Sequence, residues 1–204
     1  MNQEAQSLLY FVLNKPYQVL CQFTKSGEKQ TLANLDYKFP KDVYPVGRLD
    51  EDSEGLIILT NDTNLNNTLL HPRNQHKRTY WAQVDGDITE EAIKNLKKGI
   101  NITIDGKPFE AKAIAAEKIT PPEWLPDRNP PIRYRKEIPT SWVSLTITTG
   151  KNRQVRKMTA SVGFPTLRLI RYSIEKINLE PDFLPGMVKK IERKTILEQL
   201  QLLK

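Results

Sequence analysis

Residues 43–62 read VYPVGRLDEDSEGLIILTND. Within this stretch, GLIILTN (55–61) is a short and mainly aliphatic run, which is typical of a strand buried on both faces. The next residues, NDT, supply N-cap candidates for a short helix that carries Leu65, Leu69 and Leu70 and ends before Pro72. We therefore expect a buried strand followed by a short helix, with an acidic loop directly before the strand.

Strand-like segments outnumber helical ones along the rest of the chain. The strand patterns are SLLYFVLNKP (7–16), QVLCQFT (18–24), RTYWAQVDG (78–86), NITIDGKPFEAKAI (101–114, a hairpin about Asp105 and Gly106), SWVSLTITTG (141–150) and TLRLIRYSIEKINL (166–179). The helical patterns are DITEEAIKNLKKG (87–99), KNRQVRKMTASVG (151–163) and KTILEQLQLLK (194–204). The first of these has Asp87 and Glu90 at capping-box spacing and Gly99 as its C-terminal stop.

This distribution predicts the fold class. Strands that rarely alternate with helices favour an α+β fold with a mainly antiparallel central sheet and flanking helices. We expect residues 1–204 to form a single domain of two lobes that share one sheet.

The charge of the chain is unevenly distributed. The 204 residues contain 31 Lys and Arg against 24 Asp and Glu, a net charge of +7. Residues 128–171 contain ten basic residues and one acidic residue, Glu137, so this segment is +9 and the remainder of the chain is −2. Such a run is often only a solvated face, but one concentrated field on a slightly acidic chain favours a polyanionic partner, nucleic acid above all.

The cysteine and histidine content excludes several classes of protein. Cys21 is the only cysteine, so there is no disulfide framework, and with His71 and His76 as the only histidines a structural zinc site is also excluded. No apolar run approaches the length of a membrane span, and the first residues have no basic region or cleavage site of a signal peptide. We expect a cytoplasmic protein.

The acidic loop contains Asp50, Glu51, Asp52 and Glu54 and admits three interpretations. It is a solvated turn, a Mg²⁺ site for nuclease chemistry, or the source of one carboxylate that acts as nucleophile or base on an RNA nucleotide. Arg48 would compete with a bound metal, and no second acidic motif completes a two-metal site. The third interpretation explains why acidic and basic residues occur together, because a nearby arginine keeps a carboxylate ionised.

Six of the fourteen prolines lie in residues 121–139, together with Trp124, Tyr134 and four basic residues. Such a segment cannot form a regular element. It is either a linker between the lobes or a surface arm that lies on a ligand, and its aromatic and arginine content favours the arm.

Several motifs together resemble those of the RsuA-type ribosomal RNA pseudouridine synthases. They are NKPYQVLCQFT, GRLD, SEGLIILTND, RTYWAQVDG and GKNRQVRKMTASVGFPTLRLIR, which occur in the order of the family and cover residues 12–172. The segment NPPIRYRKEIPTSW further resembles a branch whose members act on large-subunit (23S) rRNA. Two features depart from the family pattern. The first core motif begins near residue 12, which leaves no room for an N-terminal S4 domain, and Gln18 stands where a glycine is usual.

The resemblance implies a pseudouridine synthase fold and an enzyme that isomerises a uridine of 23S rRNA without a cofactor or metal. We expect the enzyme to be a monomer. The alternative is a non-catalytic rRNA-binding or ribosome-assembly factor, which would need the basic segment but not Asp50.

Carried over by motif position, Asp50 resembles the catalytic aspartate, Tyr80 the tyrosine that stacks on the extruded base, and Arg156 the arginine paired with the aspartate. Arg48 resembles the arginine that fills the gap left by the flipped uridine. We expect RNA-binding roles for Arg48, Lys15, Arg133, Arg135, Lys151, Arg153, Arg168 and Arg171. The remaining carboxylates of the loop, those of Glu51, Asp52 and Glu54, we expect to form a solvated edge that repels misplaced phosphates.

Overall fold

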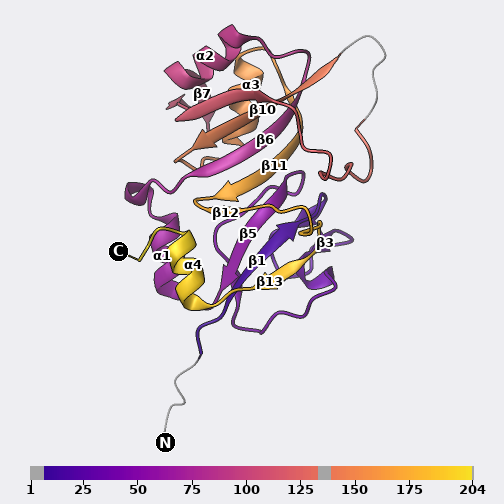
Figure 1. Cartoon of the computed structure of the whole chain (residues 1–204), viewed down its shortest axis with the longest axis vertical. Coiled ribbons are helices and arrows are strands. Elements are labelled where there is room, and N and C mark those ends of the chain that lie inside the picture. Colours follow the sequence, from indigo (N-terminus) through magenta and orange to yellow (C-terminus); the bar gives the residue numbers. More distant parts are fainter. Residues whose placement is uncertain (1–6, 133–138, 204) are drawn as a thin grey trace, which may run out of the picture.

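The computed structural model describes residues 7–132 and 139–203. Its largest sheet within these residues has nine strands (Figure 1). Seven of them follow the order β13 (Val188–Lys190), β1 (Tyr10–Lys15), β5 (Glu54–Thr60), β11 (Thr166–Ile174), β6 (Arg78–Asp85), β10 (Thr140–Ile147) and β9 (Ala115–Ile119). The other two, β4 (Tyr44–Pro45) and β12 (Ile177–Asn178), pair with β5 and β11. Every pairing in this sheet is antiparallel except that of β5 with β11, which confirms the predicted α+β fold with a mainly antiparallel sheet.

Smaller elements complete the described fold. Two further strand pairs are β2 (Val19–Leu20) with β3 (Gln30–Thr31), and the hairpin of β7 (Ile100–Ile104) with β8 (Lys107–Ala111). The helices are α1 (Thr63–Leu70), α2 (Glu90–Lys98), α3 (Gln154–Ser161) and α4 (Arg193–Gln199), with 3₁₀ turns η1 (Leu32–Asn34) and η2 (Pro72–Asn74). Figure 1 shows α2 and α3 at the β6–β10 end of the sheet, and α1 and α4 at the β1–β5 end.

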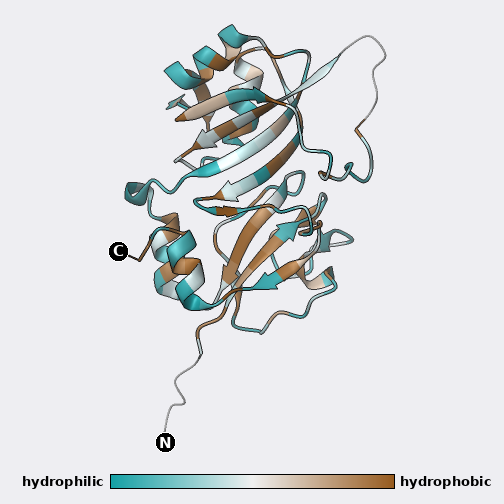
Figure 2. Cartoon of the chain, in the orientation of Figure 1, coloured by the Kyte–Doolittle hydropathy of each residue, from teal (hydrophilic) through white to brown (hydrophobic). Residues whose placement is uncertain are grey.

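Strand β5 is buried along its whole length, as the aliphatic run predicts. Leu56 and Ile58 pack into a cluster with α1 and α4, whereas Ile57 and Leu59 point to the opposite face, into a cluster with β1 and the loop around η1. In Figure 2, β1 and β5 are accordingly hydrophobic along most of their length. Burial on both faces makes β5 a rigid base for the acidic loop that precedes it.

The other end of the sheet has its own hydrophobic cluster. The residues at alternate positions of β10, Val143, Leu145 and Ile147, pack with Ala82 and Val84 of β6 against α2 and α3. This is the face that the alternation in residues 141–150 predicts. The two halves of the core meet where β5 runs parallel to β11.

That meeting point depends on a glycine. Gly55 has φ +101°, and a Cβ atom at this position would lie 2.4 Å from the carbonyl oxygen of Arg171 and 2.7 Å from its backbone nitrogen. Only a residue without a side chain allows β5 and β11 to approach this closely.

Local predictions are confirmed for most elements and wrong in detail for three. Asp62 caps α1, and the 101–114 hairpin turns at Asp105 and Gly106. Helix α2 is capped by Thr89, not by Asp87, because the Thr89 hydroxyl accepts a hydrogen bond from the backbone N–H of Ala92. The strand expected over 18–24 is limited to the two residues of β2, and Leu70 is 47% exposed rather than in the core.

Candidate active site

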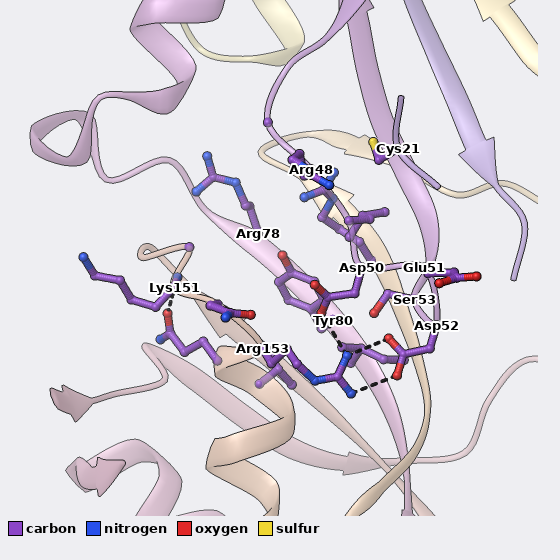
Figure 3. A pocket seen from close by; sticks show the side chains of 18 of the residues that line it. Cys21, Arg48, Asp50, Glu51, Asp52, Ser53, Arg78, Tyr80, Lys151 and Arg153 are labelled. Carbon is purple, nitrogen blue, oxygen red and sulfur yellow. Dashed lines mark hydrogen bonds and ion pairs between the residues drawn. The ribbon is translucent and has the colours of Figure 1, made fainter. Parts of the chain in front are cut away.

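A cavity of about 800 Å³ opens between the two halves of the sheet (Figure 3). One wall is the loop before β5, including Arg48, Asp50 and Asp52. The floor is formed by β6 and β11, and the opposite wall by residues 150–153 together with the first turn of α3. The site is therefore assembled from segments far apart in sequence, which the central sheet brings together.

Asp50 and Tyr80 both line this cavity, and both side chains are drawn at its centre in Figure 3. The Asp50 side chain is 38% exposed, so its carboxylate is accessible to a substrate, whereas Tyr80 is 8% exposed and offers one side of its ring from the middle of β6. An aromatic ring beside an accessible carboxylate can stack on a planar base while the carboxylate reacts with the nucleotide.

The arginine nearest to Asp50 is Arg153. Its Nη1 lies 3.7 Å from Asp50 Oδ2, and its two terminal nitrogens donate to the two carboxylate oxygens of Asp52 at 2.9 Å each. The hydrogen bond with Asp52 and the charges of Asp52 and Asp50 raise the pKa of Arg153, against a smaller opposing effect of burial.

In this structure Arg156 contacts Asp52, and its pairing with Asp50 stays a prediction. Arg156 lies one turn further along α3, and its Nη2 donates to the backbone oxygen of Asp52 at 2.7 Å and lies 3.3 Å from Asp52 Oδ2. Burial lowers the pKa of Arg156. Burial also acts to raise the pKa of Asp52, but the hydrogen bond from Arg153 and the two arginine charges outweigh it and leave this pKa lowered. Asp52 thus joins both arginines to the loop that carries Asp50.

Lys15 is bound to the same loop by a hydrogen bond to its backbone. Its side chain is fully buried, and Nζ donates to the backbone oxygens of Pro16 at 2.8 Å, Val19 at 2.7 Å and Glu51 at 3.4 Å. Burial lowers its pKa to about 8, which the charges of nearby acidic groups only partly counteract. Lys15 makes these contacts within the fold, and its contact with RNA stays a prediction.

Two further cations predicted to bind RNA are also buried. Arg168 forms a paired hydrogen bond with Glu54, at 2.8 Å from both Nε and Nη2, and donates a third bond to the backbone oxygen of Pro126. Arg171 is 5% exposed and donates from Nε to the backbone oxygen of Leu56, although it also lines the cavity. Arg168 thus has a structural role in the fold, and an RNA contact for it stays a prediction.

The remaining carboxylates do not form the solvated edge that the sequence suggested. Glu51 pairs with Lys29 at 2.7 Å, Asp52 holds the two arginines of α3, and Glu54 is 4% exposed and paired with Arg168. Each of these three carboxylates is thus paired with a basic side chain of the chain itself. The loop carries four carboxylates because three of them fix its position and leave Asp50 at the cavity.

Arg48 and Lys151 are exposed and line the cavity mouth, where a polyanion can reach them. Arg133 and Arg135 lie outside the described residues, as does Tyr134. The described part of the proline-rich segment packs on the chain itself: Trp124 contacts the hydrophobic cluster beside α1, and the Arg128 guanidinium lies 4.3 Å from the centre of the Tyr17 ring.

The sequence patterns missed several residues of the site. Arg78 lines the cavity together with Cys21, Leu70, Ile147 and Gln154. Arg78 stands two positions before Tyr80 in one strand, and this period of two places both side chains on the same face, so the spacing could have identified it. Gln154 orders the loop at the mouth, since its Oε1 accepts hydrogen bonds from Lys151 N and Thr149 Oγ1.

The described residues offer neither a cluster of metal ligands nor a membrane-spanning helix. Residues 7–132 and 139–203 contain no group of three or more His, Cys, Asp or Glu side chains placed to hold a metal ion. None of the helices described is both long enough and apolar enough to cross a membrane.

Comparison with known proteins agrees with this geometry. The family model described as RNA pseudouridylate synthase matches residues 9–161. The protein described as ribosomal large subunit pseudouridine synthase E of Vibrio parahaemolyticus is 47% identical over 189 residues, which are 93% of this chain and 76% of that protein. Its counterpart in Xanthomonas axonopodis pv. citri is 46% identical over 165 residues, 80% of this chain and 84% of that one.

A solved structure described as a pseudouridylate synthase superposes with a TM-score of 0.74 at 24% identity, and the match covers 97% of this chain and 75% of that one. At this identity the likeness shows a common fold, and it confirms the predicted pseudouridine synthase fold. The family model spans most of the chain, and it includes the acidic loop, the Tyr80 strand and the first turns of α3. The chain therefore belongs to the RNA pseudouridylate synthase family.

Proposed function

We propose that this chain converts a uridine of large-subunit ribosomal RNA to pseudouridine, with Asp50 as the catalytic residue. The observation that carries the proposal is the convergence of an accessible carboxylate, an aromatic ring and several arginines in one cavity of a chain of this family. The preference for 23S rRNA is supported by relatives at 46–47% identity that are described as acting on the large ribosomal subunit. Both lobes would act as one catalytic domain, as a monomer in the cytoplasm.

In this reaction the N1–C1′ bond of the uridine breaks, the detached uracil turns within the pocket, and a C5–C1′ bond forms. The proton on C5 is lost to a base and N1 gains one, so the composition of the RNA does not change and no cofactor is consumed. Asp50 would take part in cleaving the N1–C1′ bond. Tyr80 would stack on the base, which offsets part of the few kcal/mol that extrusion from a helix costs.

The charged residues around the cavity would have separate roles in binding the RNA and in positioning Asp50. Arg48, at the exposed mouth, would occupy the gap that the extruded uridine leaves. Lys151 and Arg153 would contact phosphates, with Arg133 and Arg135 as further contacts. Arg153 would in addition keep Asp50 ionised, because a cation 3.7 Å away favours the charged carboxylate. Arg156 would act by fixing the loop through Asp52.

The test is to map pseudouridine in ribosomal RNA from cells that lack this gene and from the same cells after re-expression. Wild type should restore one position in 23S rRNA, and Asp50→Asn should not. Asp105→Asn is the matched control, since it makes the same change at an exposed turn far from the cavity and should restore the modification fully. Restoration of pseudouridine by Asp50→Asn would overturn the assignment of Asp50 as the catalytic residue.

A further inference from the structure

Acidic and basic side chains both line the cavity, but they are not paired to the same extent. Asp50, Glu51 and Asp52 line one end. In Figure 3, Arg48 and Arg78 lie on one side of Tyr80 and Asp50, and Arg153 lies on the other side, against Asp52. The charges of Arg153 and Arg156 are partly balanced by the Asp52 carboxylate, whereas Arg78 has no carboxylate within 4.0 Å among the described residues.

Arg78 and Arg171 lie together on the cavity floor. Arg171 pairs directly with Tyr80 across β11 and β6, and Arg78 stands two residues before Tyr80, so all three side chains are on one face of the sheet. Each residue lines the cavity. The proximity of the two cations is also evident in Arg78, whose pKa is lowered first by burial and then by the charge of Arg171.

Neither arginine has a carboxylate within 4.0 Å among the described residues, although the charge of Glu175 acts on Arg78 from further away. None of the ion pairs within 4.0 Å between described residues involves Arg78 or Arg171. Arg78 donates only to the backbone oxygens of Leu69 and His76, at 2.9 and 3.3 Å. Arg171 is 95% buried, its one hydrogen bond among described residues is from Nε to Leu56 O, and its Nη2 is buried without a partner.

Two adjacent guanidinium groups without a counter-charge are costly in a partly dehydrated site, and an anion between them removes that cost. Guanidinium groups suit phosphate in particular, because their donors match its oxygens in pairs. The cavity of about 800 Å³ is also near the upper end of the roughly 300–1,000 Å³ usual for ligand sites. It has room for a nucleotide together with an adjoining phosphate.

We propose that Arg78 and Arg171 form a phosphate subsite that binds a phosphodiester directly flanking the target uridine. The subsite would orient the extruded nucleotide with its sugar and base towards Asp50 and Tyr80. Arg78 and Arg171 are binding and positioning residues here and take no part in bond cleavage. This inference rests on the proposed function, because it takes the substrate to be an RNA nucleotide.

The main experiment removes the negative charge of one phosphate linkage from the RNA and the positive charge of Arg78 from the protein. Two substrate RNAs are compared, one natural and one with an uncharged methylphosphonate at a linkage flanking the target uridine. Each is bound to wild type, Arg78→Gln and Arg78→Lys. Arg73→Gln is the matched control, because Arg73 is exposed five residues upstream, does not line the cavity, and loses the same charge.

With wild type and Arg73→Gln, methylphosphonate at one flanking linkage should weaken binding at least about tenfold, as expected for loss of a charge-assisted contact. With Arg78→Gln the same RNA change should cost less than about threefold, and Arg78→Lys should be intermediate. Equal losses in wild type and Arg78→Gln at both flanking linkages would overturn the subsite. Circular dichroism and thermal unfolding confirm that each variant is folded.

A second measurement separates this proposal from the proposed function. If wild type forms no pseudouridine in any rRNA, the proposed function fails, and titration with 5′-uridine monophosphate and with uridine still tests the subsite. Wild type should bind the monophosphate at least about tenfold more tightly, and Arg78→Gln should lose most of that preference. An unchanged preference in Arg78→Gln would show that Arg78 does not bind the phosphate.

Discussion

Replacing Arg168 by methionine should destabilise the fold without changing how the protein binds RNA. Arg168 was expected from the sequence to contact RNA, and the structure instead pairs it with Glu54. The side chains are 5% and 6% exposed, and two hydrogen bonds of 2.8 Å join them. Arg168→Met leaves the Glu54 carboxylate buried without a partner.

Breaking a buried ion pair by removing one partner costs about 3–5 kcal/mol. The loss is a large fraction of the roughly 5–15 kcal/mol that stabilises an ordinary domain. With an m-value of about 2 kcal/mol per M in urea, the unfolding midpoint should fall by about 1.5–2.5 M. The double variant Glu54→Leu/Arg168→Met should recover most of this loss, since an apolar pair of similar volume is often neutral.

The assay is urea unfolding followed by circular dichroism, together with the salt dependence of RNA binding for the folded variants. Lys194→Met is the control, because Lys194 lies 3.9 Å from Glu198 in an exposed pair and should cost less than about 0.5 kcal/mol. A destabilisation below about 1 kcal/mol for Arg168→Met would refute the burial argument. Flattening of the salt slope by roughly 0.7–0.9 would refute the assignment of Arg168 to the fold, since that is the loss of one phosphate contact.

Three further changes probe the site and its supports. Tyr80→Phe should keep most of the stacking energy of about 1–3 kcal/mol per base and Tyr80→Leu should lose it, so equal single-turnover rates for the two variants would rule out a stacking ring. Lys15 has a folded pKa of about 8, below its ordinary value of 10.5, so the unfolded chain binds more protons between these values and stability rises with pH in that window. Urea unfolding should show wild type gaining up to about 3 kcal/mol relative to Lys15→Met between pH 8 and 10.5, and a constant difference would contradict the burial of a charged Lys15. Gly55→Ala should destabilise by at least about 3 kcal/mol, because the new Cβ meets the Arg171 backbone at 2.4 Å, and an unchanged thermal midpoint would show that β5 and β11 separate easily.

The regular elements were predictable from the sequence because their causes are local. The run at 55–61 contains consecutive aliphatic side chains, and these bury both faces of β5 between two clusters. The alternating apolar residues of β10 and the leucines of α1 likewise indicate which side of each element faces the core. Cap positions were less reliable, since Asp87 and Thr89 are both good caps and only the backbone path selects Thr89.

The partners within the site were not predictable in the same way. Arg168 and Glu54 are 114 residues apart in the chain, so nothing local distinguishes this buried pair from two solvated charges. Arg153 and Arg156 lie about one turn apart at the start of α3, and the sequence does not determine that both contact Asp52 while Arg153 alone lies within 4.0 Å of Asp50 among the described arginines. Arg78 was missed although its spacing from Tyr80 contained the signal.

We propose that Asp50 performs the chemistry on a uridine drawn into this cavity. The most direct measurement uses rRNA labelled with tritium at C5 of uridine and follows tritium release in single turnover at saturating enzyme. Formation of the C5–C1′ bond displaces that hydrogen, so release reports the reaction itself. Asp50→Asn should bind the RNA within about threefold of wild type and release no tritium, because loss of the reacting group removes a transition-state interaction and not binding. Release by Asp50→Asn within about tenfold of the wild-type rate would contradict the account.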